Sequence, residues 1–303
     1  MRIVLFILLG FCLTTSCTKQ PKPTSMIPEN FDWQGHRGCR GILPENSMPA
    51  FLKALEYPVK TLELDIVVSR DSQLVISHEP WFNPAICLMP DGSSISEEEA
   101  MKMSIYQMPY DAVREFDCGS IGNERFPEQV KMQVQKPRLL DMIAATDTYA
   151  ENNGREKPHY NIEIKSDPRG YDIMFPKPNV FVELVLSELE KLDMQDRTTI
   201  QSFDVNVLEE LKKQNSPYKT AYLVEDQKEG LQANLDIITF KPEIYSPYFK
   251  VITKEVVDSL HRQNIQVIPW TVNEVEDMKN LIKMGVDGII TDYPNRIADV
   301  DKS

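Results

Sequence analysis

The stretch TLELDIVVSRDSQLVISHE, residues 61–79, decides how the rest of the chain is interpreted. Its first half is rich in Val, Ile and Leu. Glu63 and Asp65 lie two residues apart there, so a strand directs both carboxylates to one face. The polar segment SRDSQ then predicts a turn, and LVIS predicts a second strand that ends at His78. The connection is too short for a crossover helix, which needs about a dozen residues, so the two strands should pair antiparallel.

The expected hairpin brings carboxylates and an imidazole together. If its turn is centred on Asp71 and Ser72, Asp65 lies roughly opposite His78. The alternative is a solvated edge hairpin that carries charges. Leucine and isoleucine neighbours weaken that alternative, because a carboxylate in apolar surroundings is costly unless a cation or a hydrogen-bond donor satisfies it.

Length and charge limit the class of protein. The chain has 303 residues, which suits one large α/β-barrel domain or two small domains. Its formal charge of −13 argues against non-specific binding to nucleic acid or to anionic lipid. An acidic protein that acts on an anionic substrate needs a local cationic site.

The N-terminus, MRIVLFILLGFCLTTSC, resembles a bacterial lipoprotein signal. Arg2 is a minimal basic region, and residues 3–13 form an apolar core too short to span a bilayer as a helix. We expect residues 1–16 to be a signal peptide and Cys17 to carry lipid, with a plain secreted protein as the alternative. The Pro-rich residues 17–30 predict a tether. The protein is therefore expected to be exported and anchored by lipid alone, on the periplasmic side or at the cell surface.

The cysteines exclude a zinc site. No pair of Cys residues, or of Cys and His, has zinc spacing, so any metal chemistry must use oxygen ligands. Cys87 and Cys118 lie in a loop-rich segment of a chain expected to be exported, which makes them the candidates for a disulfide.

From residue 31 to about 300, predicted strands alternate with helices, as in a parallel barrel or a doubly wound sheet. Helices are expected at 47–57, 138–154, 181–194, 205–214, 254–263 and 275–285. With the LVIS strand set aside, eight strand candidates remain: 33–36, 61–66, 160–165, 198–202, 219–224, 235–240, 265–270 and 286–290. No Gly-rich nucleotide loop follows the first strand, and eight βα units match a (β/α)8 barrel, which we predict.

Residues 80 to about 136 interrupt this alternation. They are rich in Pro, Gly and aromatic residues, with one short helical turn expected at SEEEAMKM, residues 96–103. Long irregular segments in compact domains are usually functional lids or disordered. The aromatic content favours an ordered insertion that caps a site.

Unusual polar residues gather where the predicted strands end. They are His36, Glu63 and Asp65, Glu163 and Lys165, Gln201 and Ser202, Trp270 and Asn273, and Thr291 and Asp292. In barrels this end carries the chemistry, because the loops after the strands build the site there.

Taken in chain order, these motifs resemble the glycerophosphodiester phosphodiesterase family. They are His36-Arg37-Gly38, Pro44-Glu45-Asn46, Glu63-Leu64-Asp65, the strand ending at His78, Ile162-Glu163-Ile164-Lys165, Gln201-Ser202-Phe203, Trp270-Thr271-Val272-Asn273 and Asp287 to Pro294. The resemblance spans about residues 32–296. It implies a distorted TIM barrel of the phospholipase-C-like type, with an insertion after the second catalytic histidine. It also implies a divalent cation and hydrolysis of glycerophosphodiesters to sn-glycerol 3-phosphate and an alcohol.

The resemblance also implies metal ligands. Glu63, Asp65 and Glu163 would hold one divalent cation, Mg²⁺ or Ca²⁺, since three hard oxygen donors suit either ion. Glu45 is expected to help hold the ion or its water shell. The alternative for the carboxylates is a set of structural salt bridges.

His36 and His78 are the implied general acid and base. Cleavage of a phosphodiester needs one group to deprotonate the nucleophile and another to protonate the leaving alkoxide, and imidazole titrates near the working pH. His159 and His261 lack such a context and are assigned no role.

Three further residues are implied to bind the substrate. Arg37 can hold a phosphate through two hydrogen bonds, and Lys165 offers a point charge beside the metal. Trp270 is implied as a wall against the glycerol.

Two other functions compete with this interpretation. One is a phospholipase-C-like or phospholipase-D-like barrel that acts on glycerophosphoinositol or on intact lipid. The other is a binding lipoprotein without catalytic activity, which the complete set of histidines and carboxylates argues against.

Overall fold

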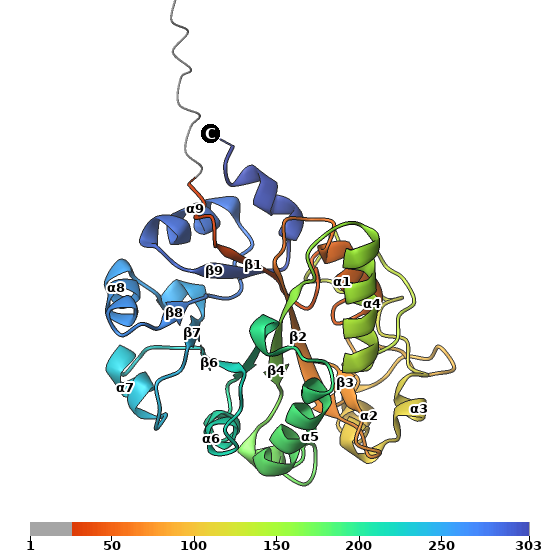
Figure 1. Ribbon diagram of the computed structural model, residues 1–303. Helices are drawn as coiled ribbons and strands as arrows, with labels where there is room; N and C mark the ends of the chain where they lie inside the picture. Colours follow the sequence, from red (N-terminus) through yellow and green to blue (C-terminus); the bar gives the residue numbers. More distant parts are fainter. Residues whose placement is uncertain (1–25, 303) are drawn as a thin grey trace, which may run out of the picture.

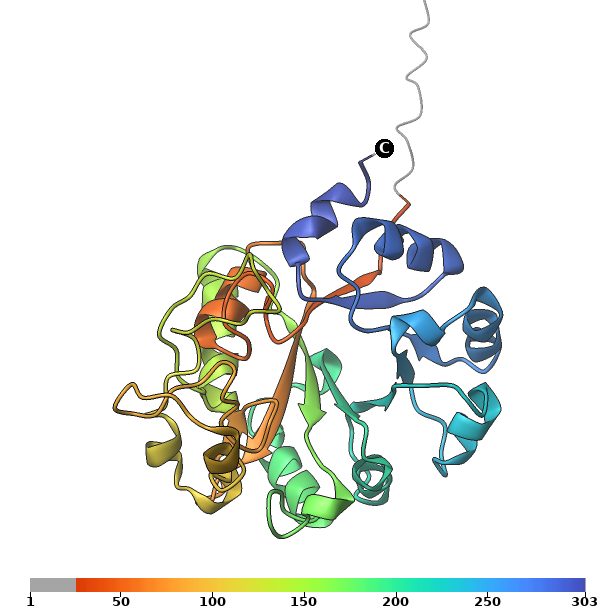
Figure 2. The same cartoon turned by 180° about the vertical axis from the view of Figure 1, so that it is seen from behind.

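The computed structural model describes residues 26–302, so the predicted signal peptide, Cys17 and most of the predicted tether lie outside the described residues. Eight parallel strands form a ring with helices around its outside, as Figures 1 and 2 show from opposite sides. The predicted TIM barrel is therefore confirmed. Within residues 26–302, none of the helices combines the length and the apolar character that crossing a membrane requires.

The strands follow one another around the ring in the order β9, β1, β2, β4, β5, β6, β7, β8. Their bounds are β1 Asp32–Gly35, β2 Thr61–Val68, β4 His159–Ile164, β5 Thr198–Ser202, β6 Lys219–Val224, β7 Ile244–Pro247, β8 Gln266–Val267 and β9 Gly288–Thr291. Backbone hydrogen bonds from Asp287 N to Val267 O and from Ile290 N to Pro269 O connect β8 with β9. These bonds bring the ends of the sheet together and nearly close the ring.

The outer helices occupy the predicted positions to within a few residues. They are α1 Met48–Ala54, α4 Leu139–Asn152, α5 Pro178–Glu190, α6 Val205–Lys213, α8 Lys254–Arg262 and α9 Val275–Met284. Helix α4 buries Leu139, Met142, Ile143 and Thr146, the spacing that places side chains on one helical face. Helix α9 ends at Gly285, whose φ of +91° an L side chain rarely adopts.

The barrel interior is polar on one side and apolar on the other. Residues that are in register on neighbouring parallel strands point to the same face. Asp65, Glu163, Gln201, Ala221 and Ile244 form such a row from β2 to β7. The row therefore changes from carboxylates to aliphatic side chains across the barrel, and the acidic groups gather on β2 and β4.

The prediction of a strand at residues 235–240 is wrong. Residues Leu231–Asp236 form the short helix α7, and Ile237 after it is 57% exposed. The barrel strand is β7, which lies between β6 and β8 and buries all its residues. The β-branched run after Leu235 satisfies local strand propensity, but only the later segment pairs with both neighbours, and pairing decides a strand.

The antiparallel hairpin of β2 with β3 (Leu74–Ile76) is confirmed, but its register is displaced by one residue. Ser77 N donates to Asp65 O, so Ser77 rather than His78 lies opposite Asp65. The cause is a three-residue loop closed between Ser69 and Gln73, with Ser72 at a φ of +60°. His78 follows the last paired residue, so the alternation of side chains along a strand does not determine where its ring points. The ring lines the same hollow as Glu63 and Glu163 despite the shifted register.

Residues 80–136 form an ordered insertion with its own apolar core. The core includes Phe82 and Phe116, whose rings stack, and it packs on Val67 and Val75 of the hairpin. Short helices α2 (Glu97–Ala100) and α3 (Tyr110–Val113) lie within the insertion. The predicted ordered segment is therefore confirmed.

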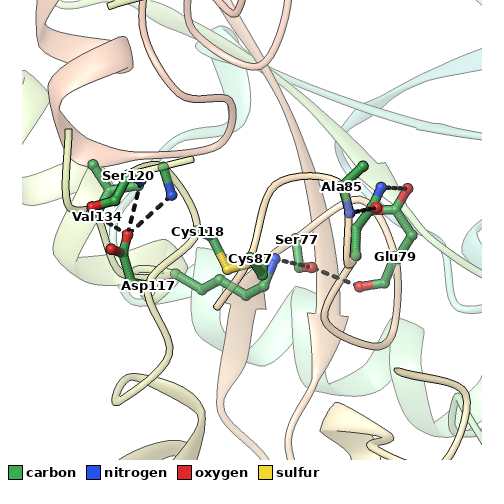
Figure 3. The surroundings of a disulfide bond; sticks show 11 residues. Ser77, Glu79, Ala85, Cys87, Asp117, Cys118, Ser120 and Val134 are labelled. Atoms are coloured by element: carbon green, nitrogen blue, oxygen red, sulfur yellow. Dashed lines mark hydrogen bonds between the residues drawn. A yellow bond between two sulfur atoms is a disulfide. The ribbon is translucent and has the colours of Figure 1, made fainter. Parts of the chain in front are cut away.

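The disulfide predicted between Cys87 and Cys118 is also confirmed, with a Cα–Cα distance of 3.9 Å (Figure 3). Asp117, next to Cys118, accepts hydrogen bonds from the backbone of Gly119, Ser120 and Val134. These contacts connect the first half of the insertion to the strand-like segment that returns to the barrel.

Candidate active site

Two strands present the three buried carboxylates. Glu63 and Asp65 lie on β2 and Glu163 on β4, with exposed fractions of 1%, 1% and 7%. Each offers an oxygen atom, and these oxygens lie within 4.8 Å of one another. The local sequence explains the arrangement, because residues two apart on β2 share a face and Asp65 is in register with Glu163.

One fully buried oxygen of these carboxylates has no hydrogen-bond partner among the described residues. Glu63 accepts from Arg37 N at 2.9 Å and from Gln201 Nε2 at 2.8 Å. Asp65 Oδ2 accepts from Asn46 Nδ2 at 2.8 Å, whereas the buried Asp65 Oδ1 has no hydrogen-bond partner among the described residues. A buried oxygen without a partner is costly, and a cation at this point would satisfy it.

Mutual repulsion is visible in the pKa values of this group. Burial, followed by the charges of Asp65 and Glu163, raises the pKa of Glu63 well above its ordinary value. Burial acts the same way on Asp65, but Arg37, His78 and Lys165 bring the pKa of Asp65 well below its usual range. The three residues therefore fit a divalent cation, which would relieve the remaining repulsion.

His36 stands directly after β1 and is held by a carboxylate from β9. Its Nδ1 lies 2.6 Å from Asp292 Oδ1, and its Nε2 lies 3.8 Å from Glu63 Oε2. Asp292 also accepts from Arg40 Nε at 2.6 Å and from Asn273 Nδ2 at 2.8 Å. Burial raises the pKa of Asp292, but His36 and Arg40 outweigh this and hold it well below the usual range.

The state of His36 follows from these contacts. An ionised carboxylate only accepts hydrogen bonds, so Nδ1 carries the proton and Nε2 has a free lone pair. Burial lowers the pKa of His36 to about 4, with Arg40 acting in the same direction and Asp292 opposing it. His36 is therefore neutral near pH 7 and able to accept a proton at Nε2.

His78 has a corresponding partner. Its Nδ1 lies 2.9 Å from Glu79 Oε1. This contact directs Nε2, the other ring nitrogen of His78, away from Glu79. Burial raises the pKa of Glu79, but His78, Arg37 and Lys136 lower it to about 2. Lys136 Nζ donates to Ser77 Oγ, and Ser77 Oγ donates to Glu79 O, beside the disulfide (Figure 3). The insertion thus supports the turn that carries His78.

The predicted cationic residues pair with the carboxylates. Lys165 Nζ lies 2.7 Å from Glu163 Oε1 and 3.8 Å from Asp65 Oδ1. Arg37 contacts Asp65 through Nε at 3.2 Å and Glu45 through a terminal nitrogen at 2.6 Å. Arg37 and Lys165 therefore lie beside the position where a bound metal ion would meet the phosphate of a substrate.

The structure does not place Glu45 among the metal ligands. Its two oxygens face Arg37 at 2.6 Å and Arg40 at 3.9 Å, so it is satisfied by arginines. Its sequence position in a polar loop next to Asn46 could not show which of several nearby cations would reach it. In this structure Glu45 holds Arg37 in place.

The loop after β1 needs a glycine to hold this geometry. Arg37 has a φ of +49° and Gly38 a φ of +84°. A Cβ atom on Gly38 would lie 2.7 Å from the backbone carbon of Ala50 in α1. The close approach of α1 therefore requires Gly38 and positions the neighbouring His36 and Arg37.

A hollow of about 220 Å³ joins most of these groups at the ends of the strands. Six predicted site residues line it: His36, Arg37, Glu63, His78, Glu163 and Trp270. The Trp270 ring meets Phe203 edge to face at 5.4 Å, and its Nε1 donates to Ser246 O. Trp270 thus forms an aromatic wall of this hollow.

Two other histidines lie away from this hollow. His159 opens β4 at the opposite end of the barrel and lines a separate hollow of about 500 Å³ together with Lys60 and Arg155. His261 on α8 pairs with Asp287 at 2.9 Å. Neither contacts the predicted site residues, in keeping with their having been assigned no role.

Sequence reasoning assigned no role to four residues of the site. Asp292 ends a predicted strand and lies in the last of the family motifs, Glu79 follows the predicted site residue His78, and Arg40 lies in the loop between two of the motifs. Arg125 of the insertion also lines the hollow, and no local pattern marks it. Arg40 and Glu79 lie close in sequence to His36 and His78, which could have marked them, whereas the spacing of Asp292 and Arg125 gives no such signal.

The barrel fold and the acidic, two-histidine site define a hydrolase of the TIM-barrel type. The model of the Glycerophosphoryl diester phosphodiesterase family matches residues 36–296. The chain belongs to this family, and it is an enzyme of the phosphodiesterase class.

Individual relatives agree with this assignment. A glycerophosphodiester phosphodiesterase of Caldanaerobacter subterraneus is 26% identical over 267 residues, which are 88% of this chain and 95% of the relative. A crystal structure from Silicibacter pomeroyi, described provisionally as a glycerophosphoryl diester phosphodiesterase, is 29% identical with a TM-score of 0.78, covering 91% of this chain and 95% of that one. An Oleispira antarctica phosphodiesterase, solved with the product sn-glycerol-3-phosphate, has a TM-score of 0.69 at 20% identity, covering 90% and 97%.

Proposed function

We propose that the chain hydrolyses glycerophosphodiesters to sn-glycerol 3-phosphate and an alcohol, using one divalent cation and two histidines. The observation that carries the proposal is the arrangement of His36 and His78 in one hollow with Glu63 and Glu163, which form a buried group of three carboxylates with Asp65. Each histidine has its own carboxylate at Nδ1. The names of the relatives and the product bound to the Oleispira protein support the choice of substrate.

Glu63, Asp65 and Glu163 would hold the cation, and the open Asp65 Oδ1 is the atom that most needs it. When bound, Mg²⁺ or Ca²⁺ would supply positive charge against the phosphoryl oxygens. Arg37 and Lys165 add to that charge from positions beside Asp65 and Glu163. Together they offset the negative charge that grows on the phosphoryl group as the reaction proceeds.

The histidines move the protons. One Nε2 accepts the proton of the attacking oxygen, which belongs to a water or to the neighbouring hydroxyl of the glycerol, while that oxygen bonds to phosphorus. The other histidine donates a proton to the alcohol oxygen as its bond to phosphorus breaks. If the glycerol hydroxyl attacks, a water opens the resulting cyclic diester in a second step, so one water is consumed along either route.

Product analysis tests the proposal. A panel of glycerophosphodiesters, incubated with and without chelator, should release sn-glycerol 3-phosphate only when divalent cation is present. Release of a cyclic phosphate instead, or cleavage of an intact phospholipid added to the panel, would support the phospholipase-like alternative. If a folded chain loaded with cation cleaves none of these compounds, the remaining interpretation is a binding lipoprotein without catalytic activity.

Histidine variants test the roles of the residues. His36→Ala and His78→Ala should each lower kcat by about 10²- to 10⁴-fold, the usual contribution of a general acid or base. Cation binding measured by calorimetry should persist in both, because the ligands are carboxylates. Turnover of glycerophosphoethanolamine near the wild-type rate by His36→Ala would contradict the assignment.

The proposed location is outside the cytoplasmic membrane, on a lipid attached to Cys17. The disulfide between Cys87 and Cys118 supports export, because such bonds persist mainly in oxidising compartments. Cys17→Ser should move the protein from the membrane to the soluble fraction. Unchanged membrane retention of this variant would contradict lipidation.

A further inference from the structure

A second hollow, of about 480 Å³, lies beside the active-site hollow. The two share Arg40, Arg125, Trp270 and Thr271 as a common wall. The second hollow is also lined by Phe126, Tyr248, Phe249, Lys250, Glu274 and Asp277, and we call it the rim groove. Because the two hollows have this wall in common, a molecule that is larger than the reacting phosphate can extend from one into the other.

The proposed substrate has the shape that this continuity suits. A phosphodiester carries two organic groups, one on each side of the reacting phosphorus. Phe203 and Leu223 line the active-site hollow but not the rim groove, and the Phe203 ring meets Trp270 edge to face. The shared wall, which includes Trp270, Thr271 and Arg40, has the active-site hollow on one side and the rim groove on the other. The two sides can therefore take the glycerol and the departing alcohol, respectively.

Two of the three basic residues that line the rim groove have no acidic partner among the described residues. Among residues 26–302, no carboxylate forms an ion pair with Arg125 or Lys250. Two of the three carboxylates that line the groove have cationic partners, since Glu274 pairs with Arg296 at 3.2 Å and the buried Asp292 pairs with Arg40 at 2.6 Å, which leaves Asp277. Arg125 and Lys250 therefore remain to attract an anionic ligand to this groove, in a chain whose formal charge is −13.

Two of the four aromatic rings of the rim groove, Phe126 and Phe249, already face cations of the protein itself. A cage for a quaternary ammonium group needs open ring faces, since a cation binds over the face of a ring. The guanidinium carbon of Arg40 lies 4.9 Å from the Phe126 ring centre, and Lys250 Nζ lies 5.7 Å from that of Phe249. The protein's own cations thus already occupy these positions and would repel a choline group.

Arg125 is held at the groove by a firm anchor. Its neighbour Phe126 is 6% exposed and packs between Arg40 and Tyr293. Asn123 closes the turn by accepting from Arg125 N through its side chain and from Phe126 N through its backbone. The guanidinium therefore projects from a fixed turn, although the side chain itself is exposed.

The segment that follows is fastened to the barrel. Gln129 Nε2 donates to Arg40 O at 2.6 Å, and Val130 N donates to Ile42 O at 2.8 Å. Glu128 pairs with Arg296 at 2.8 Å. The insertion thus places Arg125 beside the reacting centre with little freedom to move away.

We propose that the rim groove holds the departing alcohol of the substrate and that Arg125 favours an alcohol that carries its own negative charge, such as a second phosphate. The inference rests on the proposed function and extends it to substrate preference. Arg125 acts here as a specificity-determining residue that the insertion contributes.

A matched pair of substrates tests this inference. Glycerophosphoglycerol releases a neutral glycerol, whereas bis(glycerophospho)glycerol releases an alcohol that carries a second phosphodiester. Initial rates should be measured for the wild type, Arg125→Ala, Arg125→Lys and the control Arg114→Ala. Arg114 is an arginine of the same insertion that lies outside both hollows and pairs with Asp111.

We expect Arg125→Ala to lower kcat/KM for the charged substrate by about 3- to 10-fold, between the effect of an exposed ion pair and that of a charge-assisted hydrogen bond. The neutral substrate should change by less than about 2-fold, and Arg125→Lys should recover part of the preference. Arg114→Ala should behave as the wild type. Equal losses on both substrates, or no loss on either, would overturn the inference.

Failure of the proposed function can be told apart from failure of this inference. If the wild type cleaves neither compound, the proposed function is wrong, and calorimetric titration with the same two uncleaved compounds then decides the inference. The inference would stand if the wild type binds the charged compound more tightly than the neutral one and Arg125→Ala abolishes this difference. Equal affinities, or no binding, would refute it, as would a wild-type preference for glycerophosphocholine.

Discussion

Asp292→Asn is the substitution that most directly tests how the site is built. Asp292 is buried, and three donors converge on it: His36 Nδ1, Arg40 Nε and Asn273 Nδ2. Asparagine keeps the shape but replaces one acceptor oxygen with an amide donor. Whichever way the amide turns, a donor faces a donor, either at Asn273 or at His36 and Arg40.

The size of the effect follows from these contacts. A buried donor left without a partner costs about 1–3 kcal/mol, so the free energy of unfolding should fall by roughly that amount. The effect on turnover should be larger, because a neutral amide neither holds the Nδ1 proton nor stabilises the imidazolium that forms during proton transfer. The same change beside the catalytic histidine of a serine protease lowers kcat by about 10⁴-fold. We expect a loss of about 10²- to 10⁴-fold in kcat here, because the hydrogen bonds of the Asp292 carboxylate go to His36, Arg40 and Asn273.

A second histidine–aspartate pair provides the control. His261 Nε2 lies 2.9 Å from Asp287 Oδ2, which also accepts from Val267 N, outside the active-site hollow. Asp287→Asn should leave kcat unchanged within about twofold and lower stability less than Asp292→Asn, because both contacts of Asp287 go to one oxygen that an amide can replace. Steady-state kinetics and denaturant unfolding should be measured on both variants. If Asp292→Asn keeps kcat within about threefold of the wild type, or if both variants lose activity in proportion to stability, His36 does not depend on this carboxylate.

Three further predictions follow from the buried groups. Glu63→Gln and Asp65→Asn should each weaken cation binding by calorimetry, and excess cation should restore part of the activity; binding as tight as the wild type would remove them from the ligand set. The pKa of Glu79 is lowered from 4.5 to about 2, so its contribution to stability is fully present above pH 4.5 and is lost as pH falls towards 2. Glu79→Gln should therefore destabilise the protein at pH 7 more than at pH 3 in urea unfolding, and an equal effect at both would contradict this. Replacing Cys87 and Cys118 with Ala opens a loop with a sequence separation of 31 and should cost about 3–4 kcal/mol of unfolding free energy, whereas a loss below about 1 kcal/mol would show that the insertion's own core suffices.

Local patterns in the sequence were enough to predict the barrel and most of its site. The spacing of Glu63 and Asp65 determines that they share a face in any strand, and the βα alternation determines that strand ends gather at one rim. His36 and Glu163 could be placed for this reason before any contact was known. The predicted meeting of His78 with the carboxylates was right, even though the hairpin register was off by one residue.

Contacts between distant segments could not be predicted in this way. The position of β7 depends on which segment pairs with both β6 and β8. Residues 235–240 have the stronger strand propensity, but they do not make these pairs. Glu45 lies in a predicted site motif, but the positions of Arg37 and Arg40 decide that it binds them. Asp292 comes from the end of β9, 256 residues after His36, and only closure of the ring brings the two within 2.6 Å.

The sequence by itself thus determined the strand and helix alternation, the acidic face of β2 and the set of chemical groups at the rim. Those properties depend on the fixed periodicity of strands and helices, which acts over a few residues. The tertiary structure alone decided the register of the hairpin, the partner of each charged side chain and the position of Arg125 beside the site. Each of these depends on which surfaces pack and which charges meet across long separations in the chain, and a buried charge takes whichever partner the closed fold brings within reach.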